Sequence, residues 1–129
     1  MITIDDPDAL AEMHESFARY ERALIANDVD TLVELFLDAP TTVRYGIDEV
    51  QRGHAEIAAY RRSSVIAAPP RELRNTVITT FGRDAAVANT EFVPIGSDAV
   101  GRQSQTWIRT ADGWRIVSAH VSWLGGQAP

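Results

Sequence analysis

Hydrophobic and polar positions alternate over residues 101–126, GRQSQTWIRTADGWRIVSAHVSWLGG, more clearly than anywhere else in the chain. Aromatic and β-branched residues stand on both sides of a short turn at residues 111–113, which predicts a β-hairpin. Its first strand is unusually polar, because residues 102–106 read Arg-Gln-Ser-Gln-Thr where a core strand has an apolar face. We therefore expect polar groups to lie against this hairpin.

Successive side chains of a strand point to opposite faces of a sheet, so the hairpin can be divided into two faces. One face of the first strand carries Gln103, Gln105 and Trp107. A register that pairs Thr106 with Ser118 adds to this face Val117, Ala119, Val121 and Trp123. The same register puts on the opposite face Ile116, Ser118, His120 and Ser122. A slip by one residue would exchange the two sets of the second strand.

Apolar residues recur at helical spacing near the N-terminus, after an acidic stretch with a proline that is typical of a helix start. The pattern predicts a helix over residues 7–26, with Tyr20 on its buried face. A second helix is expected over residues 29–37, and a third begins after Gly53. The residues that define the first helix are Leu10, Met13, Phe17, Tyr20 and Leu24.

The remaining segments read as strands separated by glycine and proline signals. Short strands are expected at 41–45 and within 46–52, a linker at 67–70, and longer strands at 74–81 and 86–94, followed by the hairpin. Helices followed by an antiparallel meander indicate one α+β domain over residues 1–129. A strongly curved, mostly antiparallel sheet wrapped around the N-terminal helices would leave a conical cavity, which Tyr20 and one hairpin face would enter.

Composition limits the kinds of molecule that this domain is expected to bind. The formal net charge is −6 and no basic run occurs, which argues against nucleic acid and anionic membranes and favours small molecules or proteins. Cysteine is absent, so thiol chemistry is excluded. No secretory signal or membrane span is recognisable, which predicts a cytoplasmic protein. All twelve basic residues are arginines, whose planar groups grip carboxylates.

Arg44 is the first candidate for ligand binding, because its guanidinium could offer two parallel hydrogen bonds to a substrate carboxylate inside the cavity. The alternative is a surface arginine paired with Glu49. Arg74 is a second candidate for substrate binding. Its alternative role is a charge on a strand edge, which would keep neighbouring sheets away.

Side chains of the polar strand could line one wall, with the Gln103 and Gln105 amides donating and accepting and Trp107 supplying a flat surface. Glutamines on a strand are, alternatively, often solvent-facing. Glu91 could fix an arginine or carry a proton, and a structural ion pair is its simpler role. The three histidines lie on separate predicted elements, so neither a metal site nor another cofactor is predicted.

The order of elements, the GHAEI helix and the ending DGWRIVSAHVS resemble the nuclear-transport-factor-2-like (NTF2-like, SnoaL-like) cone fold. More narrowly, TVRYG, RELRNTVITTFGRD, TEF and GRQSQTW resemble the AtzH-like family, which includes HpxZ-like proteins of oxalurate catabolism. The resemblance covers about residues 9–124.

This resemblance implies a small enzyme of ureide or s-triazine catabolism that forms a homodimer through its sheet face and works beside an amidohydrolase. The implied activity is cofactor-free decarboxylation of a small anionic substrate, 1,3-dicarboxyurea, to allophanate. Arg44 matches the position of the carboxylate base of ketosteroid isomerases, Gln105 that of their oxyanion-hole acid, and Tyr20 their first-helix tyrosine. A cation and an amide in place of two carboxyl groups favour anion binding over proton abstraction from carbon.

Catalytic roles are therefore hypothesised for Tyr20, Arg44 and Gln105, with the near carboxylate of the substrate desolvated against Trp107. Two alternatives remain open. The domain could be a non-catalytic binding or assembly module that partners an amidohydrolase. It could also be an isomerase or dehydratase, which would require a base such as Glu91 or His120 in the cavity.

Overall fold

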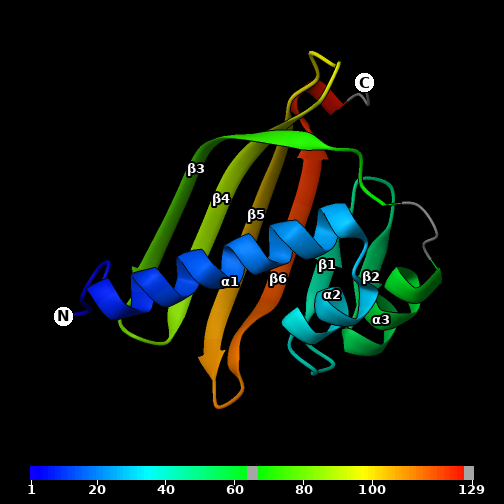
Figure 1. Ribbon diagram of the computed structural model, residues 1–129. Helices are drawn as coiled ribbons and strands as arrows, with labels where there is room; N and C mark the ends of the chain where they lie inside the picture. Colours follow the sequence, from blue (N-terminus) through cyan, green and yellow to red (C-terminus); the bar gives the residue numbers. More distant parts are fainter. Residues whose placement is uncertain (64–66, 127–129) are drawn as a thin grey trace.

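The structure, a computed structural model, describes residues 1–63 and 67–126 (Figure 1). Two helices come first, a third follows a short strand pair, and four long strands complete the chain. The elements are α1 (Pro7–Ala26), α2 (Val29–Leu35), β1 (Val43–Tyr45), β2 (Val50–Arg52), α3 (His54–Ser63), β3 (Arg71–Phe81), β4 (Ala85–Pro94), β5 (Gly101–Thr110), β6 (Gly113–Trp123) and the short 3-10 helix Leu124–Gly126.

Helix α1 has the bounds that the apolar periodicity predicts, because both of its ends are capped. The Asp6 carboxylate accepts a hydrogen bond from the Ala9 backbone N–H at 3.1 Å, and Asn27 ends the helix in the left-handed conformation. Helix α2 ends at Leu35, two residues earlier than predicted. Phe36 there adopts an extended conformation and bridges to Ile116 in β6, so packing against the sheet ends the helix.

One six-stranded sheet runs in the order β2-β1-β6-β5-β4-β3. All neighbouring strands are antiparallel except β1 and β6, which pair in parallel through Arg44 and Ala119. The expected meander of the last four strands is thus confirmed, together with the α+β class. Figure 1 shows α1 lying across one face of the sheet, with α2 and α3 beside β1 and β2. Within the described residues, no helix combines the length and apolarity needed to cross a membrane.

Two β-bulges shape this sheet. The register of β3 against β4 shifts between Arg74 and Val77, where Asn75 has a positive φ of 53°, and β3 bends sharply across the top of Figure 1. A second shift lies in the hairpin. Thr106 pairs with Ser118 as predicted, but Trp107 pairs with Ile116, which leaves Val117 as the extra residue.

The second bulge corrects the predicted faces of β6. Strict alternation put Ile116 on the outer face and Val117 on the inner one. The inserted residue reverses the alternation beyond it, so Ile116 is fully buried beside Trp107, while Ser118 and His120 stay exposed. The core between α1 and the sheet is built from Met13, Phe17, Leu32, Leu35, Phe36, Ile57, Trp107, Trp114 and Ile116.

Gly101 lets two aromatic rings meet across the sheet. It pairs with Phe92 on one side and with Trp123 on the other, and the centres of these two aromatic rings lie 5.4 Å apart. A Cβ atom added at Gly101 would overlap the Phe92 ring. The absence of a side chain is therefore required here by close packing, as when aromatic residues cover a glycine in a strand.

We predict that Gly101→Ala lowers the free energy of unfolding by about 1–3 kcal/mol, because Phe92 has to leave its packed position. Urea unfolding measures this difference. Repeating the substitution in a Phe92→Leu background is the control, since the smaller side chain relieves the overlap. An equal cost of Gly101→Ala in both backgrounds would contradict this explanation.

Candidate functional site

A cavity of about 230 Å³ lies between α1, α3 and the inner face of the sheet. Its polar lining comes from six helices and strands and consists of Tyr20, Asn27, Arg44, Tyr45, Tyr60, Arg61, Arg71, Gln103, Gln105 and His120. The described part of the lining contains three arginines and neither Asp nor Glu. Such a lining is rich in hydrogen-bond donors and is suited to an anion.

Arg44 lies in the cavity and is also held in place by the β1–β2 hairpin. Its Nη1 donates to Glu49 Oε1 at 2.7 Å and to Gln51 Oε1 at 2.8 Å, and Gln51 is its direct partner across the two strands. Its guanidinium carbon lies 5.0 Å from the centre of the Tyr60 ring. The two roles considered for Arg44, in the cavity and paired with Glu49, therefore coexist.

The backbone of the same hairpin places Glu49 beside Arg44. A Cβ atom at Gly46 would overlap the Glu49 carboxylate, so this glycine leaves room for the acid. Burial alone raises the pKa of Glu49, but the hydrogen bond and charge of Arg44 outweigh that effect and hold the pKa below its ordinary value of 4.5. Glu49 therefore stays ionised and neutralises Arg44.

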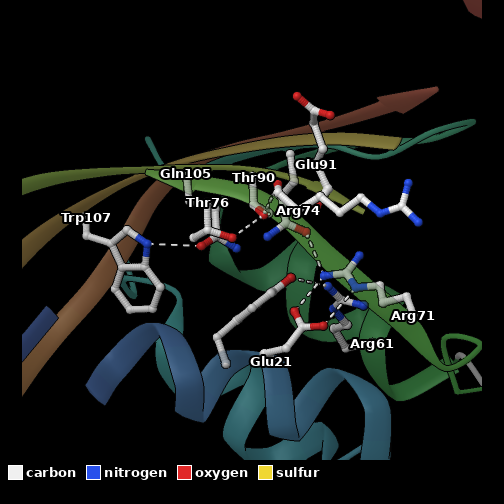
Figure 2. A network of polar contacts seen from close by, with 11 residues as sticks. Glu21, Arg61, Arg71, Arg74, Thr76, Thr90, Glu91, Gln105 and Trp107 are labelled. Atoms are coloured by element: carbon white, nitrogen blue, oxygen red, sulfur yellow. Dashed lines mark hydrogen bonds and ion pairs between the residues drawn. The ribbon is translucent and has the colours of Figure 1, made fainter. Parts of the chain in front are cut away.

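Arg71 ties α1 to the sheet through a second buried ion pair (Figure 2). Its Nε donates to Glu21 Oε2 at 2.8 Å and its Nη2 to Glu21 Oε1 at 2.6 Å, a two-pronged contact. Nη2 also donates to Gln103 Oε1 at 3.1 Å, and the guanidinium lies 4.4 Å from the Phe92 ring centre. One side chain thus connects α1, β3, β4 and β5 at the cavity wall.

Arg61 differs from the other two cavity arginines. It is 8 % exposed, and its Nη2 donates to the Tyr20 hydroxyl at 3.3 Å. Its buried Nε has no hydrogen-bond acceptor, and the ion pairs of the described residues include none with Arg61. Its guanidinium lies 5.9 Å from the centre of the Tyr60 ring, which Arg44 also contacts.

The two glutamines of β5 line the cavity, and the oxygen of each side-chain amide accepts a hydrogen bond from a neighbouring side chain. Trp107 Nε1 donates to Gln105 Oε1 at 3.1 Å, while Arg71 donates to Gln103 Oε1. Since indole and guanidinium groups can only donate, they fix which end of each amide is the oxygen. Both Nε2 groups are left buried without an acceptor. The structure thus brings Tyr20, Arg44, Gln103 and Gln105 to one cavity, while their chemical roles stay predictions.

Trp107 does not line this cavity, contrary to the expectation. It is 0 % exposed and belongs to the hydrophobic core, where the bulge at Val117 brings Ile116 beside it. Its contribution to the site is indirect, since it orients the Gln105 amide. An apolar wall is instead formed by Leu24, Phe92, Val121 and Trp123.

Arg74 and Glu91 also lie outside the cavity lining, which corrects their expected position as substrate-binding residues. Arg74 is half-exposed and approaches Glu72 at 3.4 Å, and Glu91 accepts a hydrogen bond from Asn75 Nδ2 at 3.2 Å. Figure 2 shows both side chains directed away from Arg61 and Glu21. Alternation along β3 explains the error, since Leu73 packs on the core and Arg74 therefore faces outward.

Two cavity arginines escaped the sequence analysis although local signals existed. Arg61 follows Ile57 by four residues, so it lies on the buried face of α3. Arg71 precedes Leu73 by two residues and thus shares its inner face. Charged residues at such positions would normally be assigned to solvent, but here Arg71 is buried with Glu21, and both arginines line the cavity.

A model of a known protein family, described as AtzH-like, matches residues 2–127 of this chain. The protein belongs to the AtzH-like family. A search of curated proteins gives no match.

Two solved structures are closely similar to this AtzH-like protein. A protein of unknown function from Pectobacterium atrosepticum is 51 % identical, with a TM-score of 0.90 and 94 % of each chain covered. A cystatin-like fold protein from Burkholderia xenovorans is 45 % identical, with a TM-score of 0.91 and all of each chain covered.

A more distant structure from Streptomyces avermitilis, named as a dehydratase candidate of the NTF2-like family, is 19 % identical. It covers 92 % of this chain and 98 % of its own, with a TM-score of 0.73. At this identity it shows the fold alone, which is NTF2-like as the resemblance implied. This fold carries several enzyme classes, so the reaction has to be argued from the cavity.

We predict that Arg71→Met lowers the free energy of unfolding by about 2–4 kcal/mol, because Glu21 would stay partly buried without its partner. Arg74→Met is the matched control on the same strand, and its exposed pair with Glu72 should contribute less than about 1 kcal/mol. Guanidinium chloride unfolding gives both values. Equal effects of the two substitutions would show that the buried pair is no more important than the exposed one.

We predict that Glu49→Gln changes how stability depends on pH. The folded-state pKa of Glu49 is depressed, so its contribution is present above pH 4.5 and is lost as the pH falls through the folded-state value. The wild-type protein should be more stable than the variant at about pH 7, with the gap closing toward about pH 3. Urea midpoints across this range test the prediction, and parallel curves for the two proteins would refute it.

Proposed function

We propose that this AtzH-like protein binds a small planar urea with a carboxylate at each end and removes CO2 from one end, leaving allophanate. The observation that carries the proposal is the donor lining, in which guanidinium and amide N–H groups surround a cavity whose described walls hold no acidic residue. Arginine and amide donors match the in-plane oxygens of carboxylate and ureide groups.

The size of the cavity favours a small molecule. Its volume of about 230 Å³ lies below the range of roughly 300–1,000 Å³ that is typical for pockets of drug-sized ligands. A dicarboxylated urea is a flat molecule of about ten non-hydrogen atoms, well below drug size. A steroid or a polyketide, which other cone-shaped folds can accommodate, would need a larger cavity.

The reaction requires one bond to break and one proton to move. As the bond between nitrogen and the carboxylate carbon breaks, its electron pair stays on nitrogen, the nitrogen takes a proton, and CO2 leaves. The Tyr20 oxygen accepts a hydrogen bond from Arg61, so its own O–H is free to donate to the nitrogen or the adjacent carbonyl. A polarised hydroxyl at this point stabilises the negative charge that develops on the nitrogen as CO2 leaves.

The cavity lining contains both guanidinium groups and apolar side chains, which suits a substrate with one carboxylate to hold and one to release. Guanidinium groups hold the carboxylate that remains, while Leu24, Val121 and Trp123 give the carboxylate that leaves an apolar surrounding. Moving a carboxylate out of water destabilises its charged form, and loss of CO2 removes that charge. These residues take the role first expected of Trp107.

An isomerase or dehydratase is less well supported. Such a reaction needs a base in the cavity, and the described lining has no carboxylate. His120 borders the cavity, but it alternates with the inward Ala119 and packs edge-on against Tyr45 with its ring exposed. The homodimer through the sheet face and the amidohydrolase partner stay predictions.

We predict that the purified protein accelerates CO2 release from 1,3-dicarboxyurea and that Tyr20→Phe lowers kcat by about 10²-fold, because the proton donor is removed while the ring is kept. Trapped CO2 and allophanate formation are both measured against the spontaneous rate. Thermal unfolding of the variant controls for loss of structure. A wild-type rate equal to the spontaneous one would refute the proposed reaction.

A further inference from the structure

The three cavity arginines are not equivalent in charge. Arg44 is neutralised by Glu49, and Arg71 is neutralised by Glu21. Arg61 has no carboxylate partner among the described residues, although it is as deeply buried as Arg44. Burying a cation without a counter-ion is unfavourable, and an anion bound in the cavity would offset that penalty.

Arg61 also has unused donors. Its long contact of 3.3 Å with the Tyr20 hydroxyl involves Nη2, and its buried Nε has no acceptor. A guanidinium offers five N–H groups in a plane. The Arg61 guanidinium thus has N–H donors that lack acceptors. The same residue lines the cavity.

The glutamines supply two more donors of the same kind. Gln103 and Gln105 lie two residues apart on β5 and therefore share the inner face. The contacts from Arg71 and Trp107 occupy their oxygens, so the two Nε2 groups are the ends that lack partners. Together with Arg61 they require a ligand that carries several acceptor oxygens.

We propose that Arg61, rather than Arg44, is the anchor for the substrate carboxylate, and that Gln103 and Gln105 donate to oxygens of the same ligand. The ligand class is a planar carboxylate with a neighbouring amide or ureide carbonyl. Arg44 and Arg71 are positioning residues, since their own carboxylate partners already occupy them. This assignment deepens the proposed function, because it rests on the same cavity, but it depends on binding and not on CO2 release.

Binding of two matched probes tests the assignment. Allophanate carries a carboxylate, and biuret has an amide in its place, so the ratio of their dissociation constants isolates the charge. Wild-type protein should bind allophanate more tightly, and Arg61→Met should reduce that preference by about 10- to 100-fold, the range for hydrogen bonds to a charged group. Arg62→Met, an exposed arginine at the next position of α3, is the control and should retain the preference.

Calorimetric titration gives the dissociation constants, and circular dichroism checks the fold. Arg61→Lys keeps the charge but loses the planar fork, so it should retain part of the preference even if Arg61→Met is unstable. An unchanged preference in a folded Arg61 variant would overturn the assignment. CO2 release that does not depend on Arg61 would also overturn it while leaving the proposed reaction intact, whereas Arg61-dependent binding without CO2 release would overturn only the reaction.

Discussion

The fold depends on burial of one face of α1 against a sheet that curves away from it. Met13 and Phe17 in the middle of the helix pack on the core between α1 and the sheet. Toward its C-terminus the same face presents Tyr20 and Leu24, which border the cavity. The bulge in β3 at Arg74–Val77 bends the sheet, so a single helix both closes the core and forms one wall of the site.

Such a cavity can hold charged side chains only if most of them are paired. Glu21 reaches Arg71 from α1, and Glu49 reaches Arg44 from the β1–β2 hairpin, so two of the three cavity arginines are matched by an acid behind the cavity wall. The acids thereby orient the guanidiniums without entering the described lining themselves. Removing either acid would leave a buried charge unpaired, which usually costs more than the pair contributes.

The parts of the fold that were predictable from sequence are those set by local signals. Asp6, Pro7 and the apolar spacing fix α1, and the turn at Gly113 fixes the hairpin. The parallel pairing of β1 with β6 joins distant segments and has no local signal. The bulge at Val117 likewise has none, which is why Ile116 was assigned to the wrong face.

The site residues likewise divide into those that were placed from local sequence signals and those that were not. Tyr20 and the glutamines of β5 could be placed because helical spacing and strand alternation decide their direction. Arg61 and Arg71 were missed although helical spacing and strand alternation also apply to them, because arginine is by default assigned to solvent. Arg74 was named as a candidate and Arg71 was not, although Leu73 between them marks the inner face.

The acidic character of the chain places a further constraint on anion binding. With a formal net charge of −6, the protein as a whole repels an anion at long range. At physiological ionic strength this repulsion is screened beyond about 8 Å, so it weighs little against contacts made inside the cavity. Selection of an anion must then come from short-range, desolvated hydrogen bonds. A buried guanidinium and two fixed amides that line one cavity have the short range and the directionality that this selection requires.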